Sequence, residues 1–300
     1  MNTTKFKKFV KSEKFIKFQK ELAESLYLEI AKNYNIKEER DLIKDSINPS
    51  INSREGDITI ESEYIGDKKS QVSFAGCTTS SREVGDILLS IMLVDSNSLV
   101  FHKISIVQVK KGLLHKWKPN QSGKEQLYLL SKFPKFEGVS GIFQKGKNFI
   151  LQNHSKCLGS YFFINPNVGI EFSSAYLLDI FINNLCCLCS YANSINIKNI
   201  YFRNILFCPN SFDFIENFTK FNIGEVLFSE IPYITINKEL REIFIFILRK
   251  IQEKDLKFLP FCINAYRLNI NSNIPESGKN KDNSGILLIN LLINISEFRE

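Results

Sequence analysis

The segment from Glu83 to Gly112 restricts the fold of this chain more than any other part of the sequence. It contains two long apolar runs, DILLSIMLVD and LVFHKISIVQVKK, separated by a short polar stretch around Ser96 and Asn97. Apolar runs of this kind, joined by a few turn-forming residues, predict a β-hairpin inside a sheet. Along the chain, the predicted order of helix, strand, hairpin, helix, strand and helix favours an α/β fold in which a mixed sheet is flanked by helices.

Three polar residues stand at the open end of this hairpin. Asp86 begins the first strand, and Gln108 and Lys110 end the second. Alternate residues of a strand share a face, so Gln108 and Lys110 point the same way. The start of one antiparallel strand lies beside the end of the next, so we expect Asp86 to lie near both. The plain alternative is a sheet end with three solvated side chains.

Such a trio has a chemical use. A carboxylate with one or two further oxygen ligands holds Mg²⁺, which also binds phosphate oxygens. A neighbouring lysine positions an attacking water or stabilises developing negative charge. Asp86, Gln108 and Lys110 therefore predict phosphodiester hydrolysis, with Asp86 and Gln108 as metal ligands and Mn²⁺ as a possible substitute. Asp57 also follows a glycine before a strand, but Asp86 is favoured because a simple hairpin joins it to Gln108.

The pattern Gly-Asp followed by Gln-x-Lys resembles the PD-(D/E)xK nuclease superfamily, in its variant with Gln at the second acidic position. The resemblance implies a restriction-endonuclease-like core of helix, hairpin-containing sheet, helix and strand, and residues 12–164 are predicted to follow that order. It also implies a metal-dependent DNA endonuclease in prokaryotic anti-phage defence or restriction. We expect a nuclease core over residues 1–195 and an accessory α/β region over residues 196–300, unless the two form one continuous domain.

The same resemblance implies a further acidic metal ligand from the first helix. Apolar residues at helical spacing predict that helix over Ser12 to about Tyr34. At about 100° per residue, Glu29 lies on the same face as Leu22, which points inward. A glutamate among core positions needs a partner or a metal, so Glu29 is the expected ligand. Glu61 and Glu63, on a predicted strand, remain alternatives.

Basic residues gather in two places. The net charge is +7, and residues 1–20 hold seven Lys and one Glu. A second cluster follows Lys110, in a loop that can track a phosphate backbone. Trp117 either stacks on a base or packs on the sheet edge. The residues expected to contact nucleic acid, preferably DNA, are Lys111, Lys116, Trp117, Lys118 and Gln126.

The remaining sequence features indicate the cellular compartment and the kind of protein partner. Seven irregularly spaced cysteines and Lys-interrupted apolar runs near the N-terminus favour a reducing, cytoplasmic compartment. The apolar run from Ala175 to Ala192 is interpreted as a core helix rather than a membrane span, and its cysteines as small hydrophobes rather than zinc ligands. A homodimer or a second defence subunit is the expected protein partner. The rival interpretation is a non-catalytic nucleic-acid-binding or adaptor subunit that keeps the fold.

The basic clusters predict a steep salt dependence of nucleic-acid binding. Each neutralised phosphate releases a condensed counterion, so raising KCl from 50 to 200 mM should weaken binding by roughly tenfold or more. Fluorescence anisotropy with a labelled DNA duplex measures this. An affinity that stays flat over this range would exclude a mainly electrostatic contact with nucleic acid.

Overall fold

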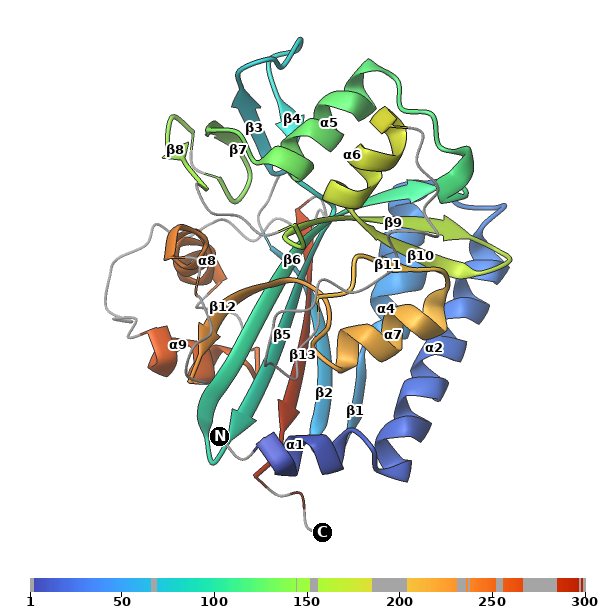
Figure 1. Ribbon diagram of the computed structural model, residues 1–300, viewed down its shortest axis with the longest axis vertical. Helices are drawn as coiled ribbons and strands as arrows, with labels where there is room; N and C mark the ends of the chain where they lie inside the picture. Colours follow the sequence, from blue (N-terminus) through green and yellow to red (C-terminus); the bar gives the residue numbers. More distant parts are fainter. Residues whose placement is uncertain are drawn as a thin grey trace.

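A computed structural model describes the chain over residues 3–65, 69–143, 145–151, 156–184, 204–230, 236, 238–251, 256–266, 285–296 and 298. Within these ranges the main sheet has nine strands (Figure 1). Eight of them follow the order β1 (Ser53–Glu55), β2 (Ile58–Ile65), β13 (Ile286–Asn294), β5 (Ile87–Asp95), β6 (Ser98–Lys111), β9 (Gly159–Asn165), β10 (Gly169–Ser174) and β11 (Phe207–Cys208). The ninth, β12 (Glu225–Ser229), pairs with β6.

Strands β5 and β6 form the predicted hairpin. Ser96 and Asn97 at its tip have φ angles of 49° and 65°. Two successive left-handed residues suit the right-handed twist of the flanking strands, and Asn tolerates that conformation better than most residues. Residues 87–94 of β5 are all buried, as are residues 99–109 of β6. The hairpin is therefore enclosed on both faces, as its continuous apolar sequence predicts.

Strand β6 changes neighbours along its length. Residues 101–104 pair with β12, and residues 106–111 pair with β9 in parallel. The connection from β6 to β9 passes through helix α5 (Gln121–Lys132), which has Asn120 as its N-cap. A Cβ atom added to Gly159 would lie 2.1 Å from the carbonyl oxygen of Leu130, so only glycine lets α5 approach the start of β9 this closely.

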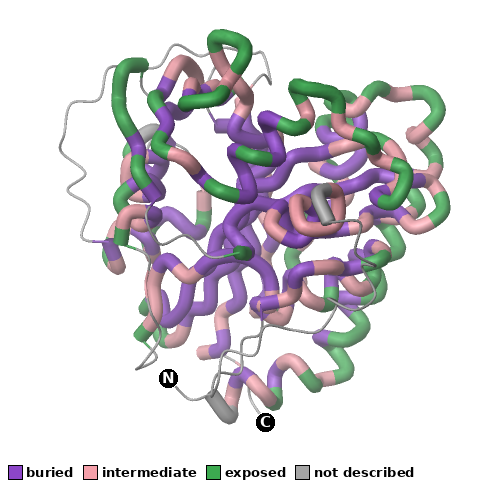
Figure 2. Tube along the Cα trace, turned by 45° about the horizontal axis from the view of Figure 1, so that its top comes forward, coloured by how far each residue is buried: buried purple, intermediate pink, exposed green. Residues whose placement is uncertain are grey.

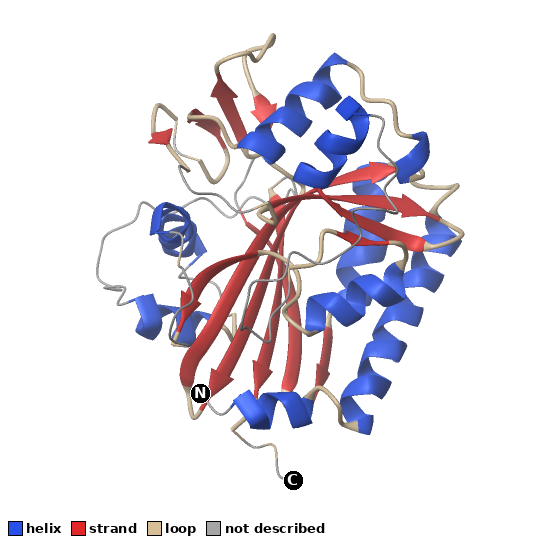
Figure 3. Cartoon of the chain, in the orientation of Figure 1, coloured by secondary structure: helices blue, strands red, loops and turns tan. Residues whose placement is uncertain are grey.

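Helices cover both faces of the sheet (Figures 1 and 3). One core cluster joins odd-numbered β5 residues such as Leu89 to the helices of the first face: α1 (Thr3–Phe9), α2 (Glu13–Asn33), α3 (Glu39–Leu42), the π-helical turn Ile43–Ile47, α4 (Asn48–Ile51) and α7 (Ser211–Thr219). The other cluster joins even-numbered residues such as Leu88 to α5, α6 (Ala175–Asn184), α8 (Lys238–Ile251) and α9 (Leu259–Tyr266). Figure 2 shows the buried strands between the two layers.

A smaller sheet lies beside α5. Its order is β4 (Arg82–Glu83), β3 (Gln71–Phe74), β7 (Phe136–Ser140) and β8 (Asn148–Phe149). Strand β4 ends only three residues before Asp86. The small sheet therefore connects directly to the open end of the hairpin, through the residues between β4 and β5.

The prediction of a mixed sheet flanked by helices is confirmed. The first long helix is also confirmed, with Ser12 Oγ accepting a hydrogen bond from the Phe15 amide as its N-cap. The segment ILLINLLINI, expected as a strand or short helix, is β13, and it lies between β2 and β5. The region expected to be accessory thus contributes an interior strand. The proposed boundary at residue 195 and the CCLC cysteines lie outside the described residues.

No helix in the described ranges is both long enough and apolar enough to cross a membrane. Helix α6 accounts for the first part of the apolar run beginning at Ala175. Its Asp179 forms an ion pair of 2.9 Å with Lys132 of α5. The polar residue inside the run is therefore used to join two helices of the same layer.

A series of buried hydrogen bonds links the central strands β13, β5 and β6 to helix α9. Ser90 donates to Asn290 at 2.7 Å and lies 3.0 Å from His102 Nε2, while His102 Nδ1 lies 2.7 Å from the Tyr266 hydroxyl. Burial lowers the pKa of His102 from 6.5 to about 3. The imidazole is therefore neutral in the folded protein at physiological pH, and it joins two hydroxyl groups across the core.

This histidine predicts a loss of stability in acid. Between pH 6.5 and about 3 the unfolded chain binds a proton at His102 that the folded chain does not bind, so the unfolding free energy falls as pH falls. Relative to His102→Gln, the wild type should lose about 2–3 kcal/mol between pH 7 and pH 4.5. Urea denaturation at both pH values measures this, and parallel pH profiles for the two proteins would contradict it.

Candidate functional site

The backbone at Asp86 is fixed on both sides. Its amide donates to the Val107 carbonyl at 2.9 Å, and its carbonyl accepts from the Leu287 amide at 2.9 Å. A Cβ atom on Gly85 would lie 2.8 Å from Ile106 Cγ2 and 3.0 Å from the Val107 oxygen. The glycine before the aspartate is therefore required by the close approach of the chain to β6.

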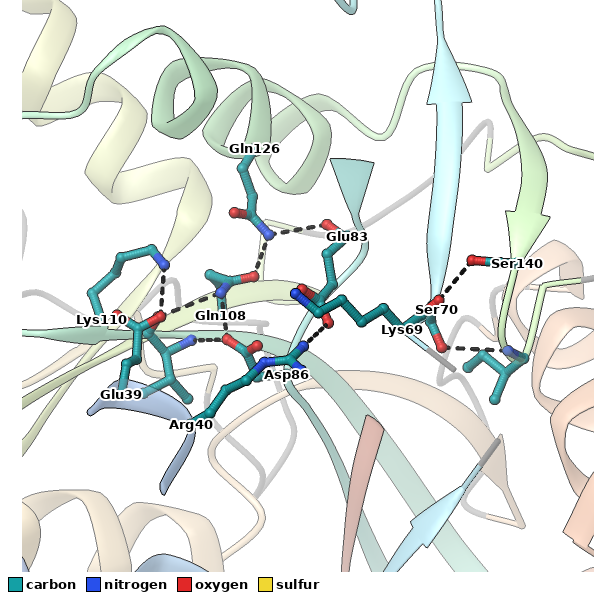
Figure 4. A network of polar contacts seen from close by, with 12 residues as sticks. Glu39, Arg40, Lys69, Ser70, Glu83, Asp86, Gln108, Lys110, Gln126 and Ser140 are labelled. Atoms are coloured by element: carbon teal, nitrogen blue, oxygen red, sulfur yellow. Dashed lines mark hydrogen bonds and ion pairs between the residues drawn. The ribbon is translucent and has the colours of Figure 1, made fainter. Parts of the chain in front are cut away.

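The structure brings the Asp86 and Gln108 side chains together (Figure 4). Asp86 Oδ2 accepts hydrogen bonds from the Val109 amide at 2.8 Å and from Gln108 Nε2. Burial and the nearby Glu83 charge raise the pKa of Asp86 from 3.8 to about 7, against the opposing effects of the Val109 hydrogen bond and the Lys110 charge. The carboxyl group is thus poised to exchange a proton, or a cation, near neutral pH.

Gln108 is buried between Asp86 and helix α5. Its Oε1 accepts from Gln126 Nε2, and Gln126 Nε2 also donates to the Glu83 backbone carbonyl at 2.9 Å. Only 3% of Gln108 and 9% of Gln126 is exposed. Gln126 was predicted to contact nucleic acid, but in the structure its amide hydrogen-bonds to the candidate site itself.

Lys110 completes the cluster with a partner that the sequence did not indicate. Its Nζ lies 3.0 Å from Glu39 Oε1, and Glu39 Oε2 accepts from the Lys111 amide at 3.1 Å. The next residue, Arg40, forms a 3.0 Å ion pair with Glu83. Helix α3 therefore places one carboxylate and one guanidinium over the end of the hairpin, as Figure 4 shows.

Glu39 and Glu83 were missed because neither has a periodic signal. Glu39 lies in a polar connection, in the stretch EERD, and it reaches Lys110 across 71 sequence positions. The only hint is an acidic cluster at the start of a four-residue helix. Nothing in the local sequence indicates which strand end that helix will contact.

A cavity of about 340 Å³ opens beside Lys110 and Gln126. Its other lining residues come from the loop after β6 and the first turn of α5: Trp117, Lys118, Pro119, Asn120, Ser122 and Gly123. Two lysines and several hydroxyl and amide groups make this lining polar and basic. The cavity therefore suits part of an anionic ligand that reaches Lys110.

Trp117 packs on the sheet while it lines this cavity. Its ring centroid lies 5.3 Å from that of Tyr161 and 5.4 Å from that of Phe163, both on β9. Among the predicted contacts to nucleic acid, Lys111, Lys116 and Lys118 are exposed. The Lys111 ammonium, however, donates to the Lys37 carbonyl at 2.9 Å and lies over the Tyr34 ring. The loop therefore offers Lys116 and Lys118 to solvent, while Lys111 is held against Lys37 and Tyr34.

The predicted acidic ligand Glu29 is not part of this network. Its carboxylate interacts with Lys32 at 3.4 Å and Asn33 at 3.1 Å, both on its own helix. The side chain points along the last turn of α2, where its own neighbours satisfy it. Its predicted role as a metal ligand gains no support from this position.

Of the other acidic candidates, Glu63 lies on β2 opposite Leu288 of β13, which separates it from β5. Glu61 accepts from the amides of Lys257 and Phe258. The Asp57 carbonyl accepts from Asn294, at the opposite end of β13 from the Leu287 amide that contacts Asp86. Asp57 and Asp86 therefore lie at opposite ends of the sheet. Of the two Gly-Asp pairs, only Gly85-Asp86 lies beside Gln108.

A group of three or more His, Cys, Asp or Glu side chains arranged to hold a metal is absent from the described residues. Asp86, Glu39 and Glu83 nevertheless gather around one strand end, and hard oxygen donors are the ligands that Mg²⁺ prefers. The raised pKa of Asp86 fits the same interpretation, because burial and the nearby charges of Glu83 and Glu39 disfavour its charged form.

Searches against protein-family models, curated proteins and solved structures find no match to this chain. The interpretation of the site therefore rests on its own geometry and chemistry.

Asp86 predicts a pH effect of the opposite sign to that of His102. Because its pKa is raised from 3.8 to about 7, the folded chain holds a proton between those values that the unfolded chain releases. The unfolding free energy therefore falls as pH rises through this window. Asp86→Asn removes the effect, so the variant should gain about 3–4 kcal/mol of unfolding free energy over the wild type between pH 4 and pH 8. Denaturation in EDTA measures this, and an unchanged difference between the two proteins would contradict it.

Proposed function

We propose that this protein is a metal-dependent nuclease that hydrolyses phosphodiester bonds in nucleic acid, with DNA as the favoured substrate. The observation that carries the proposal is the meeting of Asp86, Gln108 and Lys110 at the end of a rigid hairpin, beside a basic cavity. A buried carboxylate of raised pKa next to a lysine fits phosphoryl-transfer chemistry better than a purely structural role.

The order of elements supports the same proposal. Helix α2, the β5–β6 hairpin, α5 and β9 follow one another along the chain, and β9 pairs in parallel with β6. This is the order that the resemblance to PD-(D/E)xK nucleases implies. Strand β13, between β2 and β5, is an addition to that scheme.

The metal site that we propose uses Asp86 with Glu39 and Glu83, in place of the predicted Glu29. Mg²⁺ or Mn²⁺, when bound there, supplies an activated water and neutralises charge on the phosphate. Lys110 would leave its ion pair with Glu39 to stabilise the negative charge that develops on the phosphoryl oxygens. Asp86, Glu39 and Lys110 thus have complementary tasks at one strand end.

The path of the nucleic acid follows from the cavity. Lys118 lines it, and the exposed Lys116 belongs to the same loop. A phosphate backbone that follows this loop would bring one phosphate to Lys110. A cytoplasmic role in prokaryotic defence, with a second copy or another subunit as partner, belongs to the same proposal and comes from the resemblance alone.

Substitution at the hairpin end tests the chemistry. Asp86→Ala and Lys110→Ala should each lower metal-dependent cleavage by roughly a hundredfold or more, because each removes a group that acts on the reacting phosphate. Plasmid DNA, single-stranded DNA and RNA are incubated with EDTA, Mg²⁺ or Mn²⁺. Asp57→Asn is the matched control, since it alters the other Gly-Asp pair and should cut normally.

Circular dichroism and unfolding midpoints establish that the variants fold. Wild-type rates in both hairpin variants would place the active site elsewhere. Binding of nucleic acid by the wild type without cleavage in any metal would favour the non-catalytic adaptor instead.

A further inference from the structure

The amide groups of Gln126 and Gln108 form a chain whose direction is fixed at one end. The Glu83 backbone carbonyl can only accept a hydrogen bond, so the Gln126 group facing it at 2.9 Å is the NH₂. The same Nε2 donates to Gln108 Oε1. The Gln108 group that remains for Asp86 is therefore its NH₂, which donates to Asp86 Oδ2.

Reversing one amide would break this chain. If Gln108 turned its oxygen toward Asp86, its NH₂ would face the NH₂ of Gln126, and its oxygen would face a carboxylate. Turning Gln126 as well would place its oxygen against the Glu83 carbonyl. Both side chains are almost wholly buried, so a donor or acceptor left without a partner there is costly. The carbonyl at one end thus determines which Gln108 atom meets Asp86.

We propose that Gln126 is a positioning residue which, through Gln108, holds the Asp86 carboxylate in place, and that Gln108 serves the site as a hydrogen-bond donor rather than as a metal ligand. The geometric part of this inference stands alone, while its catalytic consequence rests on the proposed nuclease function. It replaces the predicted roles of Gln108 as an oxygen ligand and of Gln126 as a nucleic-acid contact.

The arrangement has a direct consequence for Asp86. Gln108 Nε2 and the Val109 amide both donate to Oδ2, and no hydrogen bond within the described residues engages Oδ1. The carboxylate is therefore oriented by β6 through one oxygen, and the other is left to bind a cation. Groups that orient a ligating carboxylate in this way affect metal affinity although they do not touch the metal.

The first experiment tests the donor-to-acceptor direction of the hydrogen bonds between Gln126, Gln108 and Asp86, and it needs neither metal nor substrate. Gln126→Met keeps the length and bulk of the side chain but removes its polar group. Gln126→Glu replaces a double donor with a carboxylate that faces two oxygen acceptors. In EDTA at pH 8, Gln126→Glu should therefore unfold at a temperature lower than Gln126→Met by roughly 2–6 °C.

If Gln126→Glu is as stable as Gln126→Met or more stable, the proposed direction is wrong. Gln126 would then present its oxygen to Gln108, and Gln108 would be free to offer its own oxygen to a metal. This comparison does not depend on whether the protein cleaves nucleic acid, so a failure of the nuclease proposal is recognised separately.

The second experiment separates positioning from substrate binding. Gln126→Met should weaken Mn²⁺ binding, measured by calorimetry, and lower kcat, each by roughly 10–100-fold. The Kd for labelled DNA in EDTA should stay within about twofold. Lys118→Met, which alters another residue of the same cavity, should instead raise that Kd.

The opposite pattern would overturn the positioning role. A weaker Kd for DNA in Gln126→Met, with Mn²⁺ affinity unchanged, would make Gln126 a nucleic-acid contact. An unchanged Mn²⁺ affinity together with an unchanged kcat would also overturn it, because the amide chain would then have no effect on Asp86.

Discussion

Strand β6 is the element on which the rest of the structure depends. It pairs with β5 along one edge, while its other edge is shared between β12 and β9. The change of neighbour occurs between Ile104 and Ile106, and only the part beyond it carries Gln108 and Lys110. The hydrogen bonds of one strand thus hold the core together and determine where its polar end emerges. A shift of β6 by one residue would turn both polar side chains to the opposite face.

The carboxylates at the polar end of β6 are only partly neutralised by their cationic neighbours. Asp86, Glu39 and Glu83 have Lys110 and Arg40 as cationic partners, yet burial keeps the pKa of Asp86 near 7. A sheet end built for stability alone would replace Asp86 with an apolar side chain, because burying a carboxylate costs free energy. Locally unfavourable electrostatics within an otherwise well-packed protein is what a functional site is expected to show.

The sequence predicted the elements that rest on local patterns. Helix α2 follows from its apolar spacing and its Ser12 cap, and the meeting of Asp86 with Gln108 follows from the hairpin. What it could not predict depends on contacts between distant segments. Glu39 approaches Lys110 through a short helix without periodicity, and Gln126 takes its direction from one backbone carbonyl. Glu29 has the right helical phase, but phase does not reveal that Lys32 and Asn33 satisfy its carboxylate.

The central position of β13 has a consequence for how the chain reaches its native state. Leu287 pairs with Ile87, 200 positions away, and parallel pairing over such a distance forms slowly because a long loop must close first. During synthesis β2 and β5 leave the ribosome well before the strand that separates them. Until β13 arrives, two strand edges stay open to wrong partners, which makes this stage prone to aggregation. The Leu287 amide also holds the Asp86 carbonyl, so the backbone of the candidate catalytic carboxylate, held by Val107 at its amide, gains its second hydrogen bond only when β13 docks.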